Sequence, residues 1–348
     1  MAGTTKIREI LSGRDRRIAA RAMRAGLSAL TPFYRAIVGI RNGAFNLSVR
    51  RPQRVSCPVV SIGNLTTGGT GKTPLVAWLA GQLLDQQIVP GIVSRGYQAD
   101  ESGFNDEYRE LKLRLPEVPH LQNSRRIIAA TEILQQKVSA IILDDGFQHR
   151  QLARDLDIVL IDCLNPFGYG RLIPRGLLRE PISALRRADA VVLTRVSQVD
   201  SSTIEEIRSR VVPFVPPERI SQVEFTGSQL VDSSGQTRSI DAIQQNSAIA
   251  FCGIGNPRAF HQTLSGLGWQ GKLIEFPDHH HFTTGDVQKI LEQAGTSESR
   301  QIFCTMKDLV KVSDLWVDQE INLSALMIEP TFVSGKASLV ELVLERLA

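Results

Sequence analysis

Short apolar runs alternate with amphipathic stretches over the middle of the chain. Five runs rich in Val, Ile, Leu and Ala occupy residues 59–62, 88–94, 140–143, 158–161 and 190–193. Patterns with a period of three to four residues lie between several of them, at 74–86, 124–136 and 201–211. Buried parallel strands have continuous apolar runs, and helices cover both faces of a parallel sheet. The pattern therefore predicts an α/β fold built on a parallel sheet.

The alternation breaks around residues 213–247, where prolines and polar turns separate short strand-like pieces. Strand patterns resume at 248–251, 272–276, 301–305 and 325–328, and helical patterns begin near 257 and cover 285–294 and 339–347. We therefore expect two α/β domains, at residues 55–222 and 223–348, of which the second is smaller. The last helix is a candidate to pack back on the first domain.

Residues 1–54 form an N-terminal arm with a helical pattern from about 15 to 43. Polar residues, most of them arginines, recur there beside an apolar face. This pattern is typical of a helix in a membrane interface, and equally of a helix that packs on the body with a solvated arginine face. An arginine-rich transit peptide is a third interpretation. We expect Pro32 to divide the arm into two helices, with Thr31 as the N-cap of the second.

Charge separates this arm from the rest of the chain. The arm holds 12 Lys and Arg residues against two acidic residues, a net charge of +10. The whole chain holds 40 against 36, which leaves −6 for residues 55–348. A basic arm on a mildly acidic body indicates an anionic partner, either a membrane surface or a nucleic acid.

Composition excludes several other classes of protein. With 42% hydrophobic and 22% charged residues, the chain is neither disordered nor fibrous. Its four cysteines lie far apart, which argues against a disulfide scaffold and a zinc ribbon and fits a reducing compartment. We expect no transmembrane helix, because no run of 18 apolar residues is free of charge, and we expect no signal peptide.

The strongest local signal is a glycine-rich loop between a predicted strand and a predicted helix. Glycines let several backbone amides point at a phosphate, and the helix N-terminus adds its positive dipole. A strict phosphate loop has glycine where this chain has Thr66, and a known variant has lysine where it has Thr67. The chemistry is nevertheless intact. The residues expected to hold the phosphates are Thr66, Thr67, Gly68, Gly69, Thr70, Gly71, Lys72 and Thr73.

Two acidic residues, Asp144 and Asp145, end the third predicted strand. Adjacent residues of a strand point to opposite faces, so one carboxylate faces a Mg²⁺ ion while the other points away. Thr73 is expected to supply a hydroxyl ligand to the same ion.

Further motifs resemble one particular family. They are Gly63-Asn64 before the loop, Ser94-Arg95-Gly96-Tyr97, Asp144-Asp145-Gly146-Phe147-Gln148-His149, Pro174-Arg175-Gly176-Leu177-Leu178-Arg179-Glu180-Pro181, Phe276-Pro277-Asp278-His279-His280 and Thr305-Met306-Lys307-Asp308. Together they resemble the tetraacyldisaccharide 4'-kinase, or lipid A 4'-kinase, family from about residue 30 to the C-terminus. The resemblance implies a P-loop NTPase-like kinase domain, N-terminal membrane-associating helices and a second, smaller α/β domain.

The resemblance also implies an activity. The family uses ATP and Mg²⁺ to phosphorylate the 4'-hydroxyl of an acylated glucosamine disaccharide 1-phosphate. It acts as a peripheral membrane protein at the cytoplasmic face of the bacterial inner membrane. The resemblance therefore favours an anionic membrane surface as the partner of the basic arm, with no nucleic acid and no obligate protein partner. Each Lys or Arg near an anionic surface contributes about 1 kcal/mol of binding.

Site residues follow from the resemblance, position by position. Lys72, Asp145, Asp106 and His279 are the expected catalytic residues, with Asp106 as the base that activates the sugar hydroxyl and His279 as its partner. The pair is expected to come from two domains, so that domain closure assembles the site. The expected metal ligands are Thr73, Asp144 and Glu180. The expected substrate contacts are Arg126, Gln148, His149 and Arg179.

Other functions remain open at this point. A nucleotide-switch ATPase or GTPase that acts through a protein partner fits the loop, although its signature lysine is missing at position 67. A nucleic-acid-binding ATPase predicts aromatic residues among the basic ones, and aromatics make up only 6% of the chain. The run 279–281 of three histidines beside Asp278 is also a candidate zinc site, although it has no CxxC or HExxH partner.

Overall fold

The computed structural model describes residues 7, 9–96, 104–244, 247–278, 280–295, 300–316 and 321–347. The chain divides into two compact units. The larger unit is formed by the described residues within 5–98, 116–225 and 330–348, and the smaller by those within 99–115 and 226–329. The α/β fold class is confirmed.

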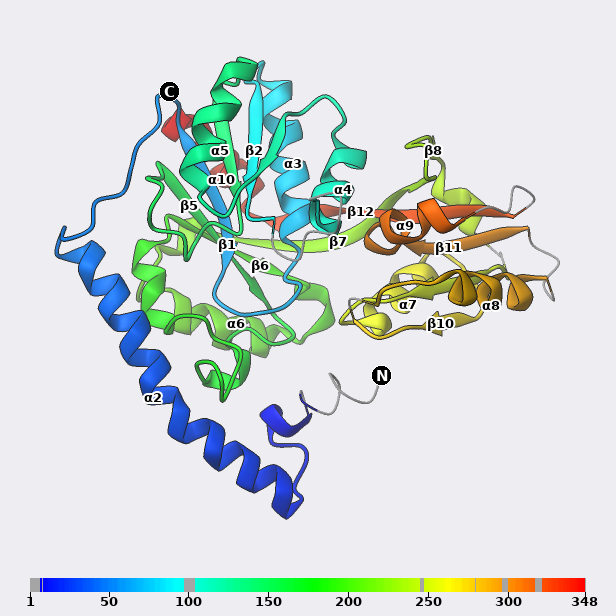
Figure 1. Ribbon diagram of the computed structural model, residues 1–348, viewed down its shortest axis with the longest axis horizontal. Helices are drawn as coiled ribbons and strands as arrows, with labels where there is room; N and C mark the ends of the chain where they lie inside the picture. The colour runs from blue at the N-terminus through cyan, green and yellow to red at the C-terminus, as the bar shows by residue number, and fades with distance from the viewer. Residues whose placement is uncertain are drawn as a thin grey trace. The chain divides into compact units, whose positions relative to one another are not determined.

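A parallel sheet organises the larger unit (Figure 1). Its strand order is β7-β6-β5-β1-β4-β2-β3, with β1 paired to β4 and β5. The strands are β1 (Val59–Asn64), β2 (Pro90–Ser94), β3 (His120–Gln122), β4 (Ala140–Asp144), β5 (Leu156–Asp162), β6 (Ala190–Thr194) and β7 (Ile220–Val231). The helices are α2 (Ile18–Asn46), α3 (Lys72–Asp85), α5 (Arg126–Ile133), α6 (Ser201–Val211) and α10 (Lys336–Leu347). Strands β1, β2, β4 and β6 are buried at every position, as their apolar runs predict.

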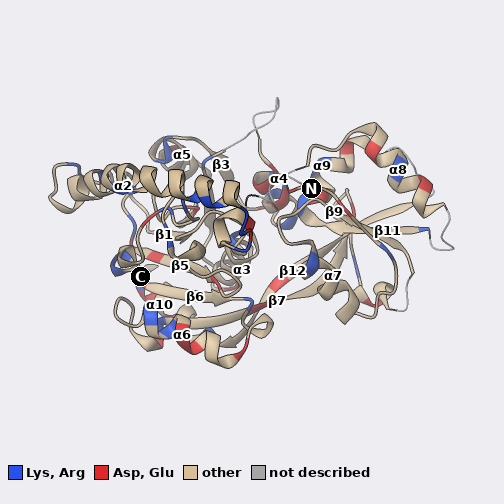
Figure 2. Ribbon diagram, turned by 90° about the horizontal axis from the view of Figure 1, so that it is seen from below, with Lys and Arg blue, Asp and Glu red and all other residues tan. Residues whose placement is uncertain are grey.

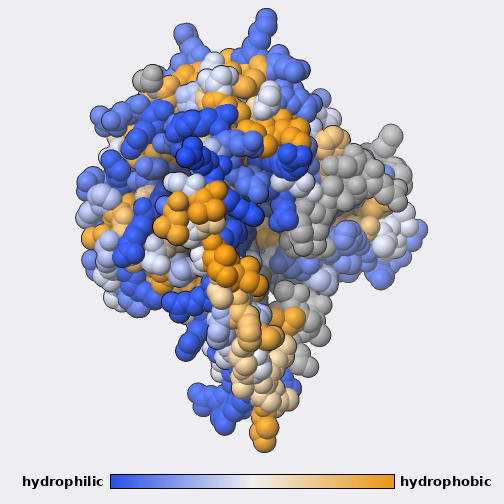
Figure 3. Space-filling model, turned by 60° about the vertical axis from the view of Figure 1, so that its left-hand side comes forward, coloured by the Kyte–Doolittle hydropathy of each residue, from blue (hydrophilic) through white to orange (hydrophobic). Residues whose placement is uncertain are grey.

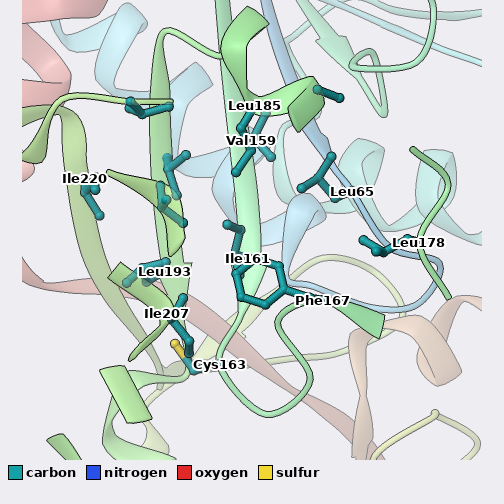
Figure 4. Close-up of a cluster of buried hydrophobic side chains, with 14 of the residues drawn as sticks. Leu65, Val159, Ile161, Cys163, Phe167, Leu178, Leu185, Leu193, Ile207 and Ile220 are labelled. Carbon is teal, nitrogen blue, oxygen red and sulfur yellow. The ribbon is translucent and has the colours of Figure 1, made fainter. Parts of the chain in front are cut away.

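The core of this unit holds the chain in place at Leu65 and at Leu178. Leu65, which directly follows β1, lies in a buried cluster with Leu178 and with Val159 and Ile161 of β5 (Figure 4). Burial of an aliphatic side chain of this size stabilises the fold by about 1.5–3 kcal/mol. The cluster therefore anchors the residue before the glycine-rich loop and the residue before Arg179.

The smaller unit has its own parallel strands, in the order β10-β9-β11-β12. They are β9 (Ile249–Cys252), β10 (Leu273–Glu275), β11 (Gln301–Thr305) and β12 (Asn322–Ser334), and β8 (Thr237–Arg238) pairs antiparallel to β7. The helices are α4 (Asp106–Arg114), α7 (Pro257–Gly266), α8 (Thr284–Ala294) and α9 (Met306–Val312). Strands β7 and β12 each contribute residues to both units.

The division of the chain differs from the expected domain ranges at α4, and it places the last helix in the larger unit, where the sequence made it a candidate to pack. Helix α4 belongs to the smaller unit, where it packs on α9, although it lies between strands of the larger one. Helix α10 belongs to the larger unit, where it buries Leu339, Leu342 and Val343. The change near residue 225 lies close to the boundary expected at 222.

Helix α2 is continuous and carries Pro32 in its interior, so the expected division into two helices is wrong. Thr31 caps nothing and instead donates its hydroxyl to the Leu27 carbonyl, at 3.0 Å. Proline costs the helix one hydrogen bond. Tertiary contacts hold the turns that follow it, because the Tyr34 hydroxyl donates to the Arg179 carbonyl (3.0 Å).

One face of α2 is apolar and exposed. Phe33, Ile37 and Ile40 expose 70%, 66% and 74% of their surface, and they follow one another at helical spacing. Figure 3 shows apolar side chains along this helix. The helix carries arginines and no acidic residue (Figure 2). Within the part of the chain that the structure describes, no helix has both the length and the hydropathy needed to cross a membrane.

Candidate active site

The glycine-rich loop joins the carboxyl end of β1 to the first turn of α3. Gly71 precedes this helix with a φ of +89°, a conformation that favours glycine. A Cβ at this position would lie 2.1 Å from the Phe225 ring. Glycine is therefore required at position 71 both by the backbone and by a close neighbour. The unpaired amides of the first turn of α3 then lie at the loop, an arrangement that binds phosphate.

Backbone hydrogen bonds fasten the start of this loop to residues 177–180. Thr67 N donates to the Leu177 carbonyl, and Arg179 N donates to the Leu65 carbonyl, each at 2.8 Å. These bonds have the spacing of a short antiparallel pairing, so the two segments hold each other in register.

The end of β6 holds the other side of the loop. The Thr194 hydroxyl donates to the Thr70 carbonyl (3.1 Å), and the Arg195 guanidinium donates to the Gly69 carbonyl (3.0 Å). Thr70 is buried, and its hydroxyl has no hydrogen-bond partner among the described residues. A buried polar atom of this kind in a loop of free amides fits a phosphate ligand.

Lys72 lies at the centre of a charged network. Its ammonium group donates to Asn64 Oδ1 (3.4 Å) and lies 3.5 Å from Asp145 Oδ1. Arg179 donates to Asp145 Oδ2 (2.8 Å) and to Gln148 Oε1 (3.1 Å). The Gln148 amide in turn donates to the Asn64 carbonyl (2.8 Å). The structure thus brings together four of the predicted residues, and adds Asn64 to them.

Asp145 stays ionised within this network. Burial raises its pKa, but the neighbouring charges of Lys72 and Arg179 outweigh burial and lower the pKa to about 2. Its negative charge holds the lysine in the loop.

Asp144 and Thr73 supply the oxygen atoms that a Mg²⁺ ion prefers. Asp144 is the buried last residue of β4, level with Ile62 of β1, and Thr73 is the second residue of α3. Over the described ranges, no group of three or more His, Cys, Asp and Glu residues forms a metal cage. An ion held mostly by nucleotide phosphates needs only one or two protein ligands, so these two residues fit Mg²⁺.

Arg126 lies near the two aspartates and near His149. Arg126 is buried, and burial followed by the charge of Arg95 lowers its pKa to about 10. Burial and the charges of Arg126, Arg154 and Arg95 lower the pKa of His149 to about 4. His149 is therefore neutral at pH 7, and Arg126 remains a cation with little competing solvent.

Glu180 does not have the surroundings of a metal ligand. Its side chain is fully buried, and both carboxylate oxygens bind other protein groups. One oxygen accepts from Arg41 and from Asn42 (3.2 Å), and the other accepts from Arg187 (2.5 Å). Two guanidinium groups occupy the positions that a cation would need, which favours a positioning role.

Asp106 begins α4 in the smaller unit, where Lys311 of α9 lies 3.1 Å from its carboxylate. The same ammonium group donates to the His280 carbonyl (3.5 Å), and the His280 ring pairs with Asp286 (3.2 Å). His279 itself lies outside the described residues. Lys311 thus joins Asp106 to the end of the Phe276–His280 motif.

The sequence placed Asp106 and its histidine in two domains, and His279 itself lies outside the described residues. Helix α4 packs on α9, so Asp106 and the described neighbours of His279 belong to the same unit. Sequence reasoning also missed Lys311. A signal was present, because Lys311 follows the Thr305–Asp308 motif by three residues.

Comparisons with known proteins show which family this chain resembles. A sequence model of the family described as tetraacyldisaccharide-1-P 4'-kinase matches residues 23–348. The tetraacyldisaccharide 4'-kinase of Halothermothrix orenii is 36% identical over 338 residues, covering 87% of this chain and 88% of that protein. The enzyme of the same description from Geobacter sulfurreducens is 33% identical over 325 residues, covering 88% and 89%. The chain belongs to the tetraacyldisaccharide 4'-kinase family.

A solved structure of this kinase family has the same fold. It is described as an "apo" form of LpxK from Aquifex aeolicus in complex with ATP. It is 27% identical to this chain, with a TM-score of 0.75, and covers 94% of this chain and all of that one. The protein is therefore a tetraacyldisaccharide 4'-kinase family phosphotransferase with a lipid disaccharide as its class of substrate.

Proposed function

We propose that this kinase transfers the γ-phosphate of ATP to the 4'-hydroxyl of a tetraacyldisaccharide 1-phosphate in the presence of Mg²⁺. The observation that carries the proposal is the position of Lys72. Its ammonium group lies at the N-terminus of α3, held by Asn64 and Asp145 at 3.4 and 3.5 Å. The ATP bound by the Aquifex aeolicus relative supports the choice of nucleotide.

On the nucleotide side, the loop 66–73 binds the phosphates through its amides and Lys72. Thr73 and Asp144 would hold Mg²⁺, which orients the phosphates and neutralises the charge that develops during transfer. Arg179 and Asp145 keep the lysine in place. Phosphoryl transfer requires mostly positioning and charge stabilisation, and this chain places both at one loop.

On the acceptor side, we assign Arg126, Gln148, His149 and Arg179 to substrate binding. Arg126 keeps its positive charge in a buried place, so it suits an anionic group such as a sugar phosphate. His149 is neutral at pH 7 and offers a hydrogen bond without charge. Gln148 and Arg179 already bind each other beside Asp145, so they line the same place.

Asp106 is the proposed general base. A sugar hydroxyl is a weak nucleophile, and a carboxylate within hydrogen-bond distance removes its proton as the phosphoryl group arrives. Lys311, at 3.1 Å, restricts the Asp106 side chain and joins it to the segment before His281. His279 remains the proposed partner of this base.

Helix α2 is the proposed membrane contact. Its exposed apolar face and its arginines match a helix that lies in the interface of an anionic bilayer. A substrate with four acyl chains stays in the membrane, so the enzyme must bind there. We therefore propose a peripheral protein on the cytoplasmic face of the bacterial inner membrane.

A kinase assay in detergent micelles tests the proposal. Purified protein is mixed with γ-labelled ATP, Mg²⁺ and tetraacyldisaccharide 1-phosphate, and the lipids are separated by thin-layer chromatography. We expect label in a bis-phosphorylated lipid and its loss with Lys72→Ala. ATP hydrolysis without labelled lipid would instead favour a nucleotide switch that acts through a partner protein.

A further inference from the structure

Glu180 is a fully buried carboxylate outside the proposed chemistry, and its partners come from a distant part of the chain. Arg41 and Asn42 belong to α2, and Arg187 follows Glu180 by seven residues. A buried charge is tolerated only when its partners satisfy it, and removal of one partner leaves a costly unpaired charge. This cluster is therefore a strong, specific joint between α2 and the 177–180 segment.

The same segment is joined to the phosphate loop. Its backbone binds the loop at Leu65 and Thr67, and the Arg179 side chain binds Asp145, which holds Lys72. Glu180, which contacts α2, directly follows Arg179, whose backbone amide donates to the residue before the loop. A shift of Glu180 must therefore move the backbone that fixes the loop.

Helix α2 contacts this segment at one further point, through Tyr34, and contacts Arg150 beyond the segment. The Tyr34 hydroxyl donates to the Arg179 carbonyl (3.0 Å), and Arg150 donates to the Asn42 carbonyl (3.0 Å) while its guanidinium lies 5.1 Å from the Phe45 ring centre. Tyr34, Arg41 and Phe45 repeat at helical spacing, on a different face from Phe33, Ile37 and Ile40. One face of α2 is thus exposed and apolar, and another holds the segment beside the nucleotide loop.

We propose that Glu180 and Arg41 are positioning residues for the phosphate loop, so that α2 is part of the frame of the nucleotide site as well as the lipid contact. The nucleotide site is that of the proposed function. Two linked joints lead from the helix to the loop, Arg41 to Glu180 and Arg179 to Asp145. Loss of the first joint loosens Arg179 and thereby the Asp145–Lys72 pair.

The test measures ATP affinity of the full-length protein without lipid, by isothermal titration of Mg-ATP. A helix that served only for membrane binding would not influence this quantity. We expect Arg41→Met and Glu180→Gln each to raise the Kd for Mg-ATP about ten-fold, since each opens the same joint. Arg41→Lys should restore part of the affinity because it keeps the charge.

A matched control and a double variant sharpen the result. Arg208→Met removes an arginine of similar exposure (26%, against 37% for Arg41) that also pairs with a glutamate, but on α6. It should leave the Kd unchanged. The double variant Arg41→Met with Glu180→Gln should bind ATP no more weakly than either single variant, because partners in one joint are not additive.

Some outcomes would overturn the proposal. They are a Kd for Arg41→Met within about two-fold of wild type, or effects of the two variants that simply add. Circular dichroism and thermal unfolding identify a variant that fails to fold. If Glu180→Gln fails to fold, Arg41→Met, at a partly exposed position, still tests the proposal. If wild type binds ATP but labels no lipid, the proposed function fails while this inference still stands or falls by the Kd.

Discussion

At the scale of single residues, the site depends on charges held in fixed pairs. Asp145 lies between Lys72 and Arg179, and Glu180 lies between Arg41 and Arg187. Both acids were singled out from sequence motifs, but only the structure separates their surroundings. A motif shows which residue types are present, whereas some donors around these carboxylates come from distant parts of the chain, as Arg41 does at 139 residues from Glu180.

His149 makes the stability of the protein dependent on pH. Burial, with nearby arginines, lowers its pKa from 6.5 to about 4 in the folded protein. The unfolded chain therefore binds more protons between these values, and the free energy of unfolding falls as the pH drops from about 6.5 to 4. We expect His149→Gln to lose less stability over this interval than wild type. Urea unfolding at pH 7, 5.5 and 4.5 measures the difference, and parallel pH curves for the two proteins would refute it.

Lys311 is expected to act through Asp106. Lys311→Met should lower kcat about ten-fold or more, because the base loses the group that orients it, and should leave the KM for ATP nearly unchanged. Lys311→Arg should retain more activity because it keeps a cation near the carboxylate. Steady-state kinetics in micelles check this, with the exposed Lys289→Met of α8 as the control. Wild-type turnover in Lys311→Met would contradict the role.

At the scale of elements, apolar runs located the fully buried strands well, because a strand covered on both faces has no solvent-exposed position and therefore few polar residues. The same rule failed for β7 and β12. Only residues 325–328 of β12 were expected, whereas the strand covers Asn322–Ser334. Both long strands mix buried and open positions along much of their length, so a continuous apolar run marks at most a part of each. Pro32 led to the wrong prediction of two helices, because tertiary contacts such as that of Tyr34 with Arg179 hold α2 together.

Helix α2 supports a prediction at this scale. Phe33→Ser, Ile37→Ser and Ile40→Ser combined should abolish most binding to vesicles that contain anionic lipid. These side chains are largely exposed, so the melting temperature should hardly change. Val38→Ser, on the buried face of the same helix, should instead lower the melting temperature. Vesicle sedimentation and thermal unfolding measure both quantities, and undiminished sedimentation of the triple variant would exclude α2 as the lipid contact.

At the scale of the whole molecule, neither unit is a continuous piece of chain. Helix α4 joins the smaller unit and α10 the larger one, against their order in the sequence. Periodicity predicted the last helix, which was a candidate to pack back on the first domain, but it predicted no helix at α4, and a pattern along the chain contains no information on where α4 returns. Asp106 was therefore placed with the wrong domain, although its residue type was noted.

The two units should respond differently to ATP. Leu339→Ala in α10 and Leu264→Ala in α7 each remove a buried side chain, at an expected cost of about 2–5 kcal/mol. We expect Mg-ATP to raise the melting temperature of the transition that Leu339→Ala lowers, since ligand stabilises the unit that binds it. It should act less on the transition that Leu264→Ala lowers. Differential scanning calorimetry with and without nucleotide measures this, and equal protection of both would show that the units unfold together.

The placement of α10 also has a consequence for biosynthesis. The ribosome makes the glycine-rich loop and most of the larger sheet early. The surface of this unit that buries Leu339, Leu342 and Val343 is covered only after α10 has been synthesised. Until then an apolar surface stays open in a chain that already carries the exposed apolar face of α2. We therefore expect the larger unit to complete its fold only after the smaller unit has been synthesised, in contrast to domains that fold one after another from the N-terminus.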